Sequence, residues 1–367
     1  MSMLDGWDGW DGWDGWDGWG GDSGRRAGSG GGPVIGLLRS REAIVGPFPD
    51  DKEPTPWLPL SDGELPEAHE SDALARWSPA IRQRVVLGEL LGAVRFDKGT
   101  TSPGNSLTLQ TPGGVAIATI TRPSKEVFAH QAKLVEAWSV HRAERAPEIE
   151  SQLQLNMAYW GSIVPLDPRN TPYTIELLLV AVAFASHVVQ RFKHELNCPR
   201  PRQYSPRIQP MLTDPPYSTM PSGHATESFM LAALLETLLT PKSTGAVVDS
   251  RTDWVTQAAE QMQDLAERVA TNRVVAGIHF PIDNAAGRAL GTSLAEFLAH
   301  GARSKTWTAR TFDVGSDSVS AYTYEFDRRL DTFVAHSDAK DAVALGLVLW
   351  LWRKARREWY PLSVDGE

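Results

Sequence analysis

The sequence predicts a mainly α protein, a helical bundle with irregular extensions at its N- and C-terminal ends. Two observations favour this class. Apolar residues recur at helical spacing in several long segments, and the segment 172–193 is apolar on nearly every side. A helix that is apolar all round belongs in the centre of a bundle. Apolar residues make up 42% of the 367, which is enough for a large core.

Residues 1–32 form a low-complexity tail that we expect to be disordered. Asp-Gly-Trp repeats five times between Asp5 and Trp19, and a Gly- and Ser-rich stretch follows. A period of three fits neither helix nor strand, and Gly-rich sequence cannot hold a packed core. Because exposed tryptophans are costly, an aromatic arm that binds a partner or a polymer is the alternative.

Residues 33–121 are expected to form an N-terminal wrap with one helix and one hairpin. The stretch from Pro33 to Asp62 is Pro-rich and irregular. A helix is predicted over 71–94, where apolar residues recur on one side. Residues 107–121 alternate in polarity around a Pro-Gly-Gly turn, a pattern typical of a hairpin.

Residues 122–301 are expected to form the helical core. Helices are predicted over the ranges 124–144, 147–160, 172–193, 223–239, 253–276 and 281–298. Prolines after residue 198 end the central apolar helix, Ser222 is a favoured N-cap for the next one, and Pro281 suits a first helical turn. The polar residues at these helix ends are the candidates for a functional site.

Residues 302–367 are expected to form a C-terminal extension. The stretch from Thr306 to Tyr324 predicts short strands or a loop, and a last helix is predicted over 338–358. This helix is apolar first and basic at its end, which favours packing on the bundle or on a second subunit as a homodimer. An interfacial membrane helix is the alternative.

Three polar blocks interrupt the apolar core, and each supplies a different part of a pocket for a tetrahedral oxyanion. The blocks are Lys193-x6-Arg200-Pro201, Pro221-Ser222-Gly223-His224 and Arg273-x5-His279-x3-Asp283. Three cations attract such an anion, and an arginine fork matches two of its oxygens at once. Ser222 and Gly223 begin a helix whose free N–H groups point at the anion, and Gly permits a close approach.

Two histidines stand beside this expected cradle in different settings. His224 lies in the first turn of a helix, where it is placed for acid–base work. His279 lies just before a helix start, and Asp283 in the first turn can reach back to one of its ring nitrogens. The other nitrogen is then free as a nucleophile or a metal ligand. Each block alone is weak evidence, but the three together complement one another.

The three blocks resemble the tripartite motif of the type 2 phosphatidic acid phosphatase and vanadium haloperoxidase superfamily. That motif reads Lys-x6-Arg-Pro, then Pro-Ser-Gly-His, then Ser-Arg-x5-His-x3-Asp. This chain departs from it at Asn272, which keeps a small polar side chain where the pattern has Ser. The resemblance covers residues 184–297 and implies a helical bundle of the vanadium haloperoxidase and acid phosphatase type.

The resemblance also implies a role for each residue. The oxyanion-binding residues would be Lys193, Arg200, Ser222, Gly223 and Arg273. The catalytic residues would be His224 as acid–base, His279 as the group that bonds to phosphorus or ligates vanadate, and Asp283 as its orienting partner.

Three functions are consistent with these roles. A vanadium-dependent haloperoxidase, which oxidises halide with hydrogen peroxide and uses vanadate as its cofactor, is narrowly favoured. It fits a soluble chain with the full motif and an aromatic, Pro-rich loop, and the preference rests on fold-level analogy. The alternative is a soluble acid phosphatase that hydrolyses phosphomonoesters through a phosphohistidine and needs no cofactor. The third is a non-catalytic phosphate-binding scaffold, although anion binding alone requires no nucleophile.

The composition of the chain limits which partners it can bind and in which cellular compartment we expect it. A formal net charge of −9 argues against a nucleic-acid partner and leaves a small-molecule or anionic substrate. The single cysteine, Cys198, fits a reducing compartment. Because we find no secretory signal and no apolar run long enough to span a bilayer, we expect a cytoplasmic protein of a soluble branch of the superfamily.

Overall fold

The computed structural model describes residues 73–98, 105–154, 157–241, 250–301, 303, 305–315 and 333–360. The chain divides into two compact units, Met1–Arg76 and Trp77–Glu367. In the first unit, only a short 3-10 turn, η3 (Ala73–Arg76), is described. The predicted disordered tail and the Pro-rich stretch lie outside the described residues.

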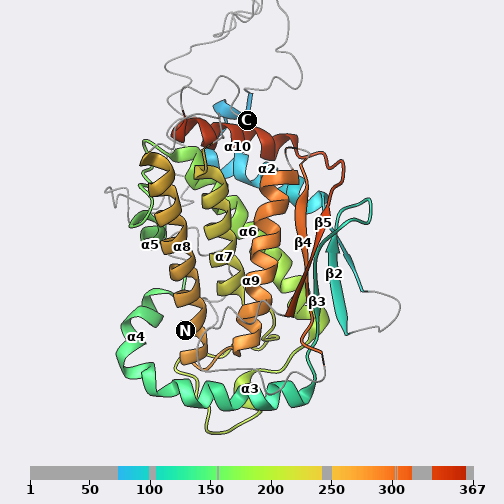
Figure 1. The fold of residues 1–367 in the computed structure, drawn as a ribbon, viewed down its shortest axis with the longest axis vertical. Coiled ribbons are helices and arrows are strands. Elements are labelled where there is room, and N and C mark those ends of the chain that lie inside the picture. Colours follow the sequence, from blue (N-terminus) through green and yellow to red (C-terminus); the bar gives the residue numbers. More distant parts are fainter. Residues whose placement is uncertain are drawn as a thin grey trace, which may run out of the picture. The chain divides into compact units, whose positions relative to one another are not determined.

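Helices dominate the second unit, which confirms the mainly α class (Figure 1). The longest helices stand side by side, and the helices α3 and α10 cross their two ends (Figure 1). The helices are α2 (Pro79–Gly92), α3 (Lys125–Trp138), α4 (Arg142–Ser151), α5 (Met157–Gly161), α6 (Pro172–Leu196), α7 (Gly223–Leu239), α8 (Ser250–Val275), α9 (Pro281–Glu296) and α10 (Gly346–Trp359). The shorter turns are η4 (Ser139–His141), η5 (Pro201–Gln203) and the π-helical turn η6 (Phe297–Gly301).

Two glycines of α9 allow it to lie unusually close to α7. A Cβ atom at Gly287 would come within 2.8 Å of the Ser222 carbonyl oxygen, and one at Gly291 would overlap the Thr226 carbonyl. Only glycine permits this approach, because these distances are shorter than the contacts that non-bonded carbon and oxygen atoms make. The Ser222 N–H then donates to the Asp283 carbonyl at 3.0 Å. Close packing therefore sets the start of α7 against the start of α9.

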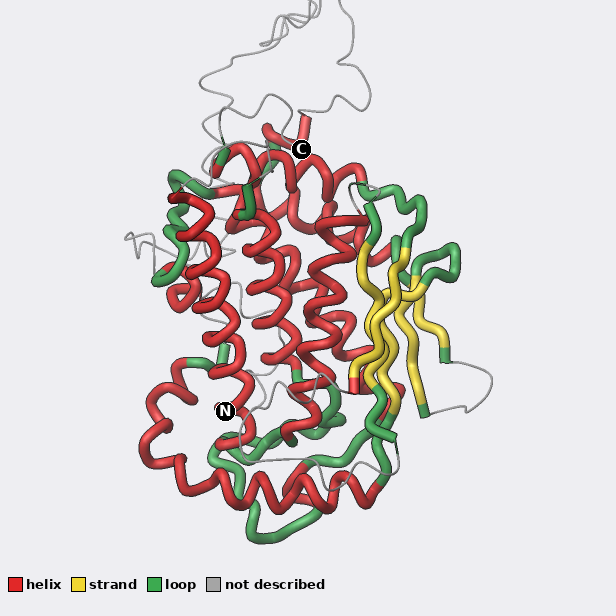
Figure 2. Tube along the Cα trace, viewed as in Figure 1, coloured by secondary structure: helices red, strands yellow, loops and turns green. Residues whose placement is uncertain are grey.

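A five-stranded sheet lies along one side of the helices (Figure 2). Its strands, in spatial order, are β1 (Arg95–Asp97), β2 (Ser106–Gln110), β3 (Ala116–Thr121), β4 (Trp307–Phe312) and β5 (Val334–Ala339). The predicted hairpin is β2–β3, and Gly114 takes the left-handed conformation in its turn, with φ of 83°. Strand β4 joins it in parallel, with Ala118 opposite Arg310. All other neighbours are antiparallel. The hairpin confirms its prediction, and β4 lies in the stretch predicted to hold short strands or a loop, whereas the pairing of all five strands into one sheet was not predicted.

The last helix begins later than predicted. Residues 338 and 339 belong to β5, which pairs with β4, and α10 starts only at Gly346. The Glu89 carboxylate of α2 accepts the N–H groups of Leu347 at 3.0 Å and Val348 at 2.9 Å, so a side chain from another helix caps α10 there. Helix α10 packs on α6, α2 and α7, as one of the alternatives predicted. Association with a second subunit stays a prediction.

Three helix predictions in the first half of the chain were wrong in their limits. The helix predicted over 71–94 is α2, which starts only at Pro79. The helix predicted over 124–144 ends at Trp138, and the next one, predicted over 147–160, begins at Arg142 and ends at Ser151. The predicted start at residue 147 falls inside α4, where Pro147 lies in the helix interior.

Helix α6 packs on α7, α10 and α2 but exposes one face at His187, Gln190 and Arg191, so it is less central than predicted. It also contradicts the expectation that no apolar run is long enough to span a membrane. The stretch Pro172–Gln203 is long and apolar enough to cross a membrane, judged by length and composition alone. The run is longer than expected because α6 continues unbroken to Leu196. The stretch is mostly buried, and its Glu176 forms a buried two-pronged ion pair with Arg82 of α2, at 2.7 and 2.5 Å. Core helices of soluble proteins pass the same test, so the finding is weak evidence for a span.

Because α7 and α9 lie so close together, we expect alanine to destabilise the protein at Gly291 but not at a glycine with open space around it. Gly291→Ala should lower the free energy of unfolding by about 1–3 kcal/mol, because the added methyl group meets main-chain atoms that cannot move aside. Gly88→Ala on α2 is the matched control, since nothing lies within 4 Å of a Cβ there. Urea unfolding of both variants measures the difference. Equal stability of Gly291→Ala and the wild type would contradict the packing argument.

Candidate functional site

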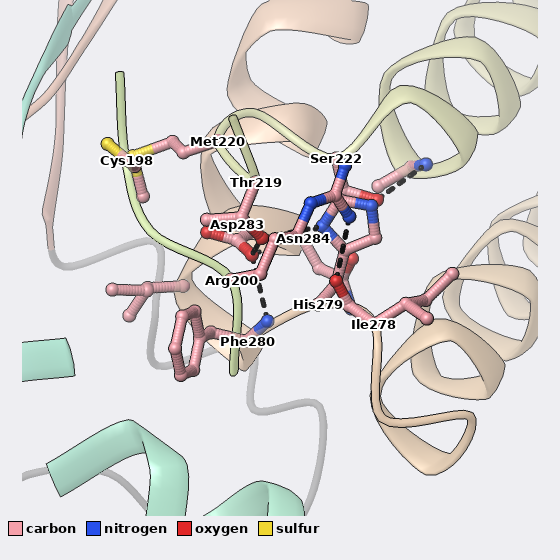
Figure 3. Close-up of polar contacts among 12 residues, drawn as sticks. Cys198, Arg200, Thr219, Met220, Ser222, Ile278, His279, Phe280, Asp283 and Asn284 are labelled. Carbon is pink, nitrogen blue, oxygen red and sulfur yellow. Dashed lines mark hydrogen bonds and ion pairs between the residues drawn. The ribbon is translucent and has the colours of Figure 1, made fainter. Parts of the chain in front are cut away.

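The three sequence blocks meet where the loops before α7 and before α9 come together (Figure 3). Lys193 lies in the last turn of α6, and Arg200 follows it in the loop that leads to η5. His224 lies in the first turn of α7, and Arg273 in the last turn of α8. His279 precedes α9, whose first turn holds Asp283. The Arg200 guanidinium donates to the Ile278 carbonyl, and the Ser222 N–H donates to the Asp283 carbonyl, so the three blocks are in contact.

Main-chain carbonyl groups hold Lys193 and Arg200. The Lys193 ammonium donates to the carbonyl groups of Ser218 at 3.0 Å and Thr219 at 3.1 Å. The Arg200 guanidinium donates to Tyr217 at 2.9 Å and Ile278 at 2.8 Å. Burial lowers the pKa of both side chains, and their mutual repulsion lowers that of Lys193 further. Two buried cations are thus fixed beside each other.

Arg273 differs from the other two cations because part of its guanidinium has no partner. It is fully buried, and its Nη2 donates to the Ile149 carbonyl at 3.1 Å and to Gln152 Oε1 at 3.4 Å. Its Nε and Nη1 atoms meet no hydrogen-bond acceptor among the described residues. Burial lowers its pKa to about 10, which still leaves it charged at neutral pH. Unmet buried donors are costly, and an oxyanion would satisfy these two.

Main-chain contacts determine the tautomer of His224. Its Nε2 lies 3.0 Å from the Gln152 carbonyl oxygen and 3.1 Å from that of Leu153. Carbonyl oxygens only accept, so Nε2 carries the hydrogen and Nδ1 is left as a proton acceptor. Burial, reinforced by Arg273, lowers the pKa of His224 to about 3. The imidazole is therefore neutral before an anion binds.

His279 has the opposite arrangement. Its Nδ1 lies 3.1 Å from Asp283 Oδ2 and 3.2 Å from the Thr219 hydroxyl, so Nδ1 carries the hydrogen and Nε2 is left unprotonated. The same Asp283 oxygen accepts the Thr219 hydroxyl at 2.5 Å and the Phe280 N–H at 2.8 Å. Burial lowers the pKa of His279 and, despite these donors, raises that of Asp283 to about 6.

Ser222 and Gly223 form the open end of α7. Ser222 is its N-cap, and its hydroxyl oxygen accepts the Ala225 N–H at 3.4 Å, which leaves the hydroxyl hydrogen to donate. A Cβ at Gly223 would meet only a methyl group of Val189, at 3.9 Å. The main chain is therefore accessible here, as an approaching anion requires.

Sequence reasoning missed two residues of this site. Thr219 contacts both His279 and Asp283, yet it lies in a Pro-rich loop with no local signal. Gln152 ends α4 and contacts Arg273 from far along the chain. Its Oε1 also accepts the side-chain amide of Asn272 at 2.9 Å, the residue that departs from the family pattern. Neither contact can be predicted without the tertiary structure.

A family model for the PAP2 superfamily matches residues 175–307. The chain carries a PAP2 superfamily domain. The match runs from the start of α6 to the first residue of β4 and so contains every predicted site residue. No curated protein matches the chain. The PAP2 match supports an enzyme of this superfamily.

The pocket of this PAP2 domain is suited to an anion. The described residues contain no group of three His, Cys, Asp or Glu side chains that could hold a metal cation. Phosphate and vanadate are oxyanions, and both fit the unmet donors of Arg273, the Lys193 and Arg200 charges and the open start of α7. For vanadate, the ligand from the protein would be His279 Nε2.

Thr219 offers a test of the site geometry. Thr219→Val keeps the shape but removes the donor that orients Asp283, and through it His279, so affinity for orthovanadate should fall about 10- to 100-fold. Isothermal titration measures this affinity. Thr237→Val on α7 is the control, because its hydroxyl donates only to the Ala233 carbonyl of its own helix. Unchanged affinity in Thr219→Val would remove Thr219 from the site.

Glu227 offers a second test, through pH. It lies one turn after His224 on α7, and burial raises its pKa from 4.5 to about 7, although Lys193 opposes the shift. The folded state then holds this proton more tightly than the unfolded state, so the contribution of Glu227 to stability falls as pH rises from about 4.5 to about 7.

Glu227→Gln removes this dependence, so the variant should gain free energy of unfolding relative to wild type between pH 5 and pH 8. Urea unfolding across this range measures the gain. Glu150→Gln, at an exposed position of α4, is the control and should show no such trend. If the difference in free energy of unfolding between Glu227→Gln and wild type stays constant with pH, the raised pKa of Glu227 is contradicted.

Proposed function

We propose that the pocket binds a tetrahedral oxyanion and that His279 Nε2 bonds to its central atom. The observation that carries this proposal is the pair of imidazoles with opposite tautomers in one buried cationic pocket. His279 keeps Nε2 unprotonated as a nucleophile, and His224 keeps Nδ1 unprotonated as a proton acceptor. An anion-binding scaffold would need neither feature.

The reaction that these groups support best is hydrolysis of a phosphomonoester. His279 Nε2 attacks phosphorus, a phosphohistidine forms, and the bond to the ester oxygen breaks. The leaving oxygen needs a proton. His224 is neutral in the empty pocket, but the negative charge of a bound phosphate raises its pKa, so that it can bind a proton together with the substrate and donate it.

The second half of the reaction returns the pocket to its starting state. A water molecule attacks the phosphohistidine while His224 Nδ1 takes its proton, and the P–N bond breaks to release phosphate and regenerate His279. Asp283 stabilises the positive charge that His279 carries while it is bonded to phosphorus. Arg273, Lys193 and the start of α7 stabilise the negative charge on the phosphoryl oxygens.

A vanadium-dependent haloperoxidase is the second candidate, and one observation favours it. His224 stays neutral down to a pH of about 3, which suits a group that accepts a proton from a neutral ligand such as hydrogen peroxide. Bound vanadate would supply the Lewis-acid activation of peroxide that halide oxidation needs. His279 would ligate it, and Lys193, Arg200, Ser222, Gly223 and Arg273 would hold its oxygens.

Two assays of one purified sample separate the candidates. Phosphate release from a chromogenic phosphomonoester is followed with and without orthovanadate, and dye bromination is followed with orthovanadate, hydrogen peroxide and bromide. We expect hydrolysis that vanadate inhibits. Turnover in the bromination assay alone would assign the protein to the haloperoxidases and overturn the phosphatase proposal.

Variants test the assigned roles in the same assays. His279→Ala should abolish turnover, because the bond-forming nitrogen is lost, whereas His224→Ala should lower it about 10²- to 10⁴-fold, the usual contribution of acid–base catalysis. His187→Ala on α6, outside the three blocks, is the control for loss of a histidine. Full activity of folded His279→Ala would exclude His279 as the bond-forming group in both enzymatic candidates. No turnover by wild type in either assay would favour the scaffold.

A further inference from the structure

The end of α4 supports the pocket from outside the PAP2 segment. Residues 148–153 precede the matched range of 175–307, and none of them belongs to the three sequence blocks. This segment nevertheless contacts both His224 and Arg273. Among its residues, Gln152 contributes its main chain to one of these contacts and its side chain to the other. It is 3% exposed.

The main chain of this segment acts on His224. The Gln152 and Leu153 carbonyl oxygens both lie within 3.1 Å of His224 Nε2. The position of the α4 end therefore determines which ring nitrogen carries the hydrogen. A shift of this segment would release Nε2 and allow the hydrogen to move to Nδ1, which would remove the proton acceptor.

The side chain of Gln152 acts on Arg273. Its Oε1 accepts from Arg273 Nη2 at 3.4 Å and from Asn272 Nδ2 at 2.9 Å. Together with the Ile149 carbonyl, it occupies the Nη2 atom of the guanidinium. The Nε and Nη1 atoms meet no acceptor among the described residues and remain available to an anion.

An ion pair anchors Gln152 itself. Its Nε2 donates to Glu148 Oε1 at 3.2 Å, and the Glu148 carboxylate pairs with Arg268 of α8 at 2.9 and 2.7 Å. Arg268 lies on the same helix as Arg273, so the contacts run from α8 to the end of α4 and back to α8. This closed path holds the rotamer of Gln152, because both ends of its amide are bonded.

We propose that Gln152 is a positioning residue of the oxyanion pocket: it orients the Arg273 guanidinium through its side chain and sets the His224 tautomer through its carbonyl. This inference rests on the proposed oxyanion pocket. It assigns a functional role to a segment that the PAP2 motif does not include. Gln152 itself touches no substrate and acts through the two residues that do.

A double-mutant cycle in the full chain tests the proposal. Affinities for orthovanadate and inorganic phosphate are measured by isothermal titration for wild type, Gln152→Leu, Arg273→Lys and the double variant. We expect Gln152→Leu to weaken binding about tenfold in the wild-type background, as loss of an outer-shell partner does, and less than twofold in the Arg273→Lys background. An equal loss in both backgrounds indicates a merely structural role and overturns the proposal.

Two further measurements keep the outcome decisive. Gln83→Leu, which removes another buried glutamine, from α2, should leave both affinities unchanged. Nitrogen-15 spectra of wild-type histidines, with His224→Gln for assignment, should show His224 protonated at Nε2; protonation at Nδ1 overturns the proposal even if Gln152→Leu fails to fold. If wild type binds neither anion, the proposed function fails. If wild type binds and Gln152→Leu binds equally well, only the role of Gln152 fails.

Discussion

The close approach of α7 and α9 is the constraint on which the site depends. Gly287 and Gly291 allow the main chain of α7 to rest directly on α9, and Ser222 then bonds to the main chain of Asp283. This contact places the open start of one helix beside the His279–Asp283 pair at the start of the other. A wider separation would leave the start of α7 and the His279–Asp283 pair in different places, whatever residues they carried.

The burial of three positively charged side chains is the second constraint, and it destabilises the folded state. Lys193, Arg200 and Arg273 are each less than 5% exposed, and burial lowers the pKa of all three. Main-chain carbonyl groups satisfy Lys193 and Arg200, whereas Arg273 keeps two unmet donors. The pocket thus holds unsatisfied positive charge before it binds anything, and an oxyanion would relieve it. Such preorganisation lets the site act without rearranging its charges.

The local signals in the sequence were strong where helices begin and end. Ser222 and Pro281 correctly predicted the starts of α7 and α9, because capping and proline geometry depend on neighbouring residues alone. The helix start predicted at residue 147 falls inside α4, and the last helix was predicted to start too early because residues 338 and 339 pair with β4. Thr219 and Gln152 gave no signal at all. Their importance comes from contacts with residues far away in the chain.

The sequence by itself determined the helical class and predicted the residues of the candidate pocket, since periodicity, capping and motif spacing are written along the chain. Only the tertiary structure decided which nitrogen of each histidine is free, which arginine keeps unmet donors and how the five strands pair. The physical reason is the same in each case. Tautomer, donor satisfaction and strand pairing depend on partners that lie far apart in the chain and meet only when it folds.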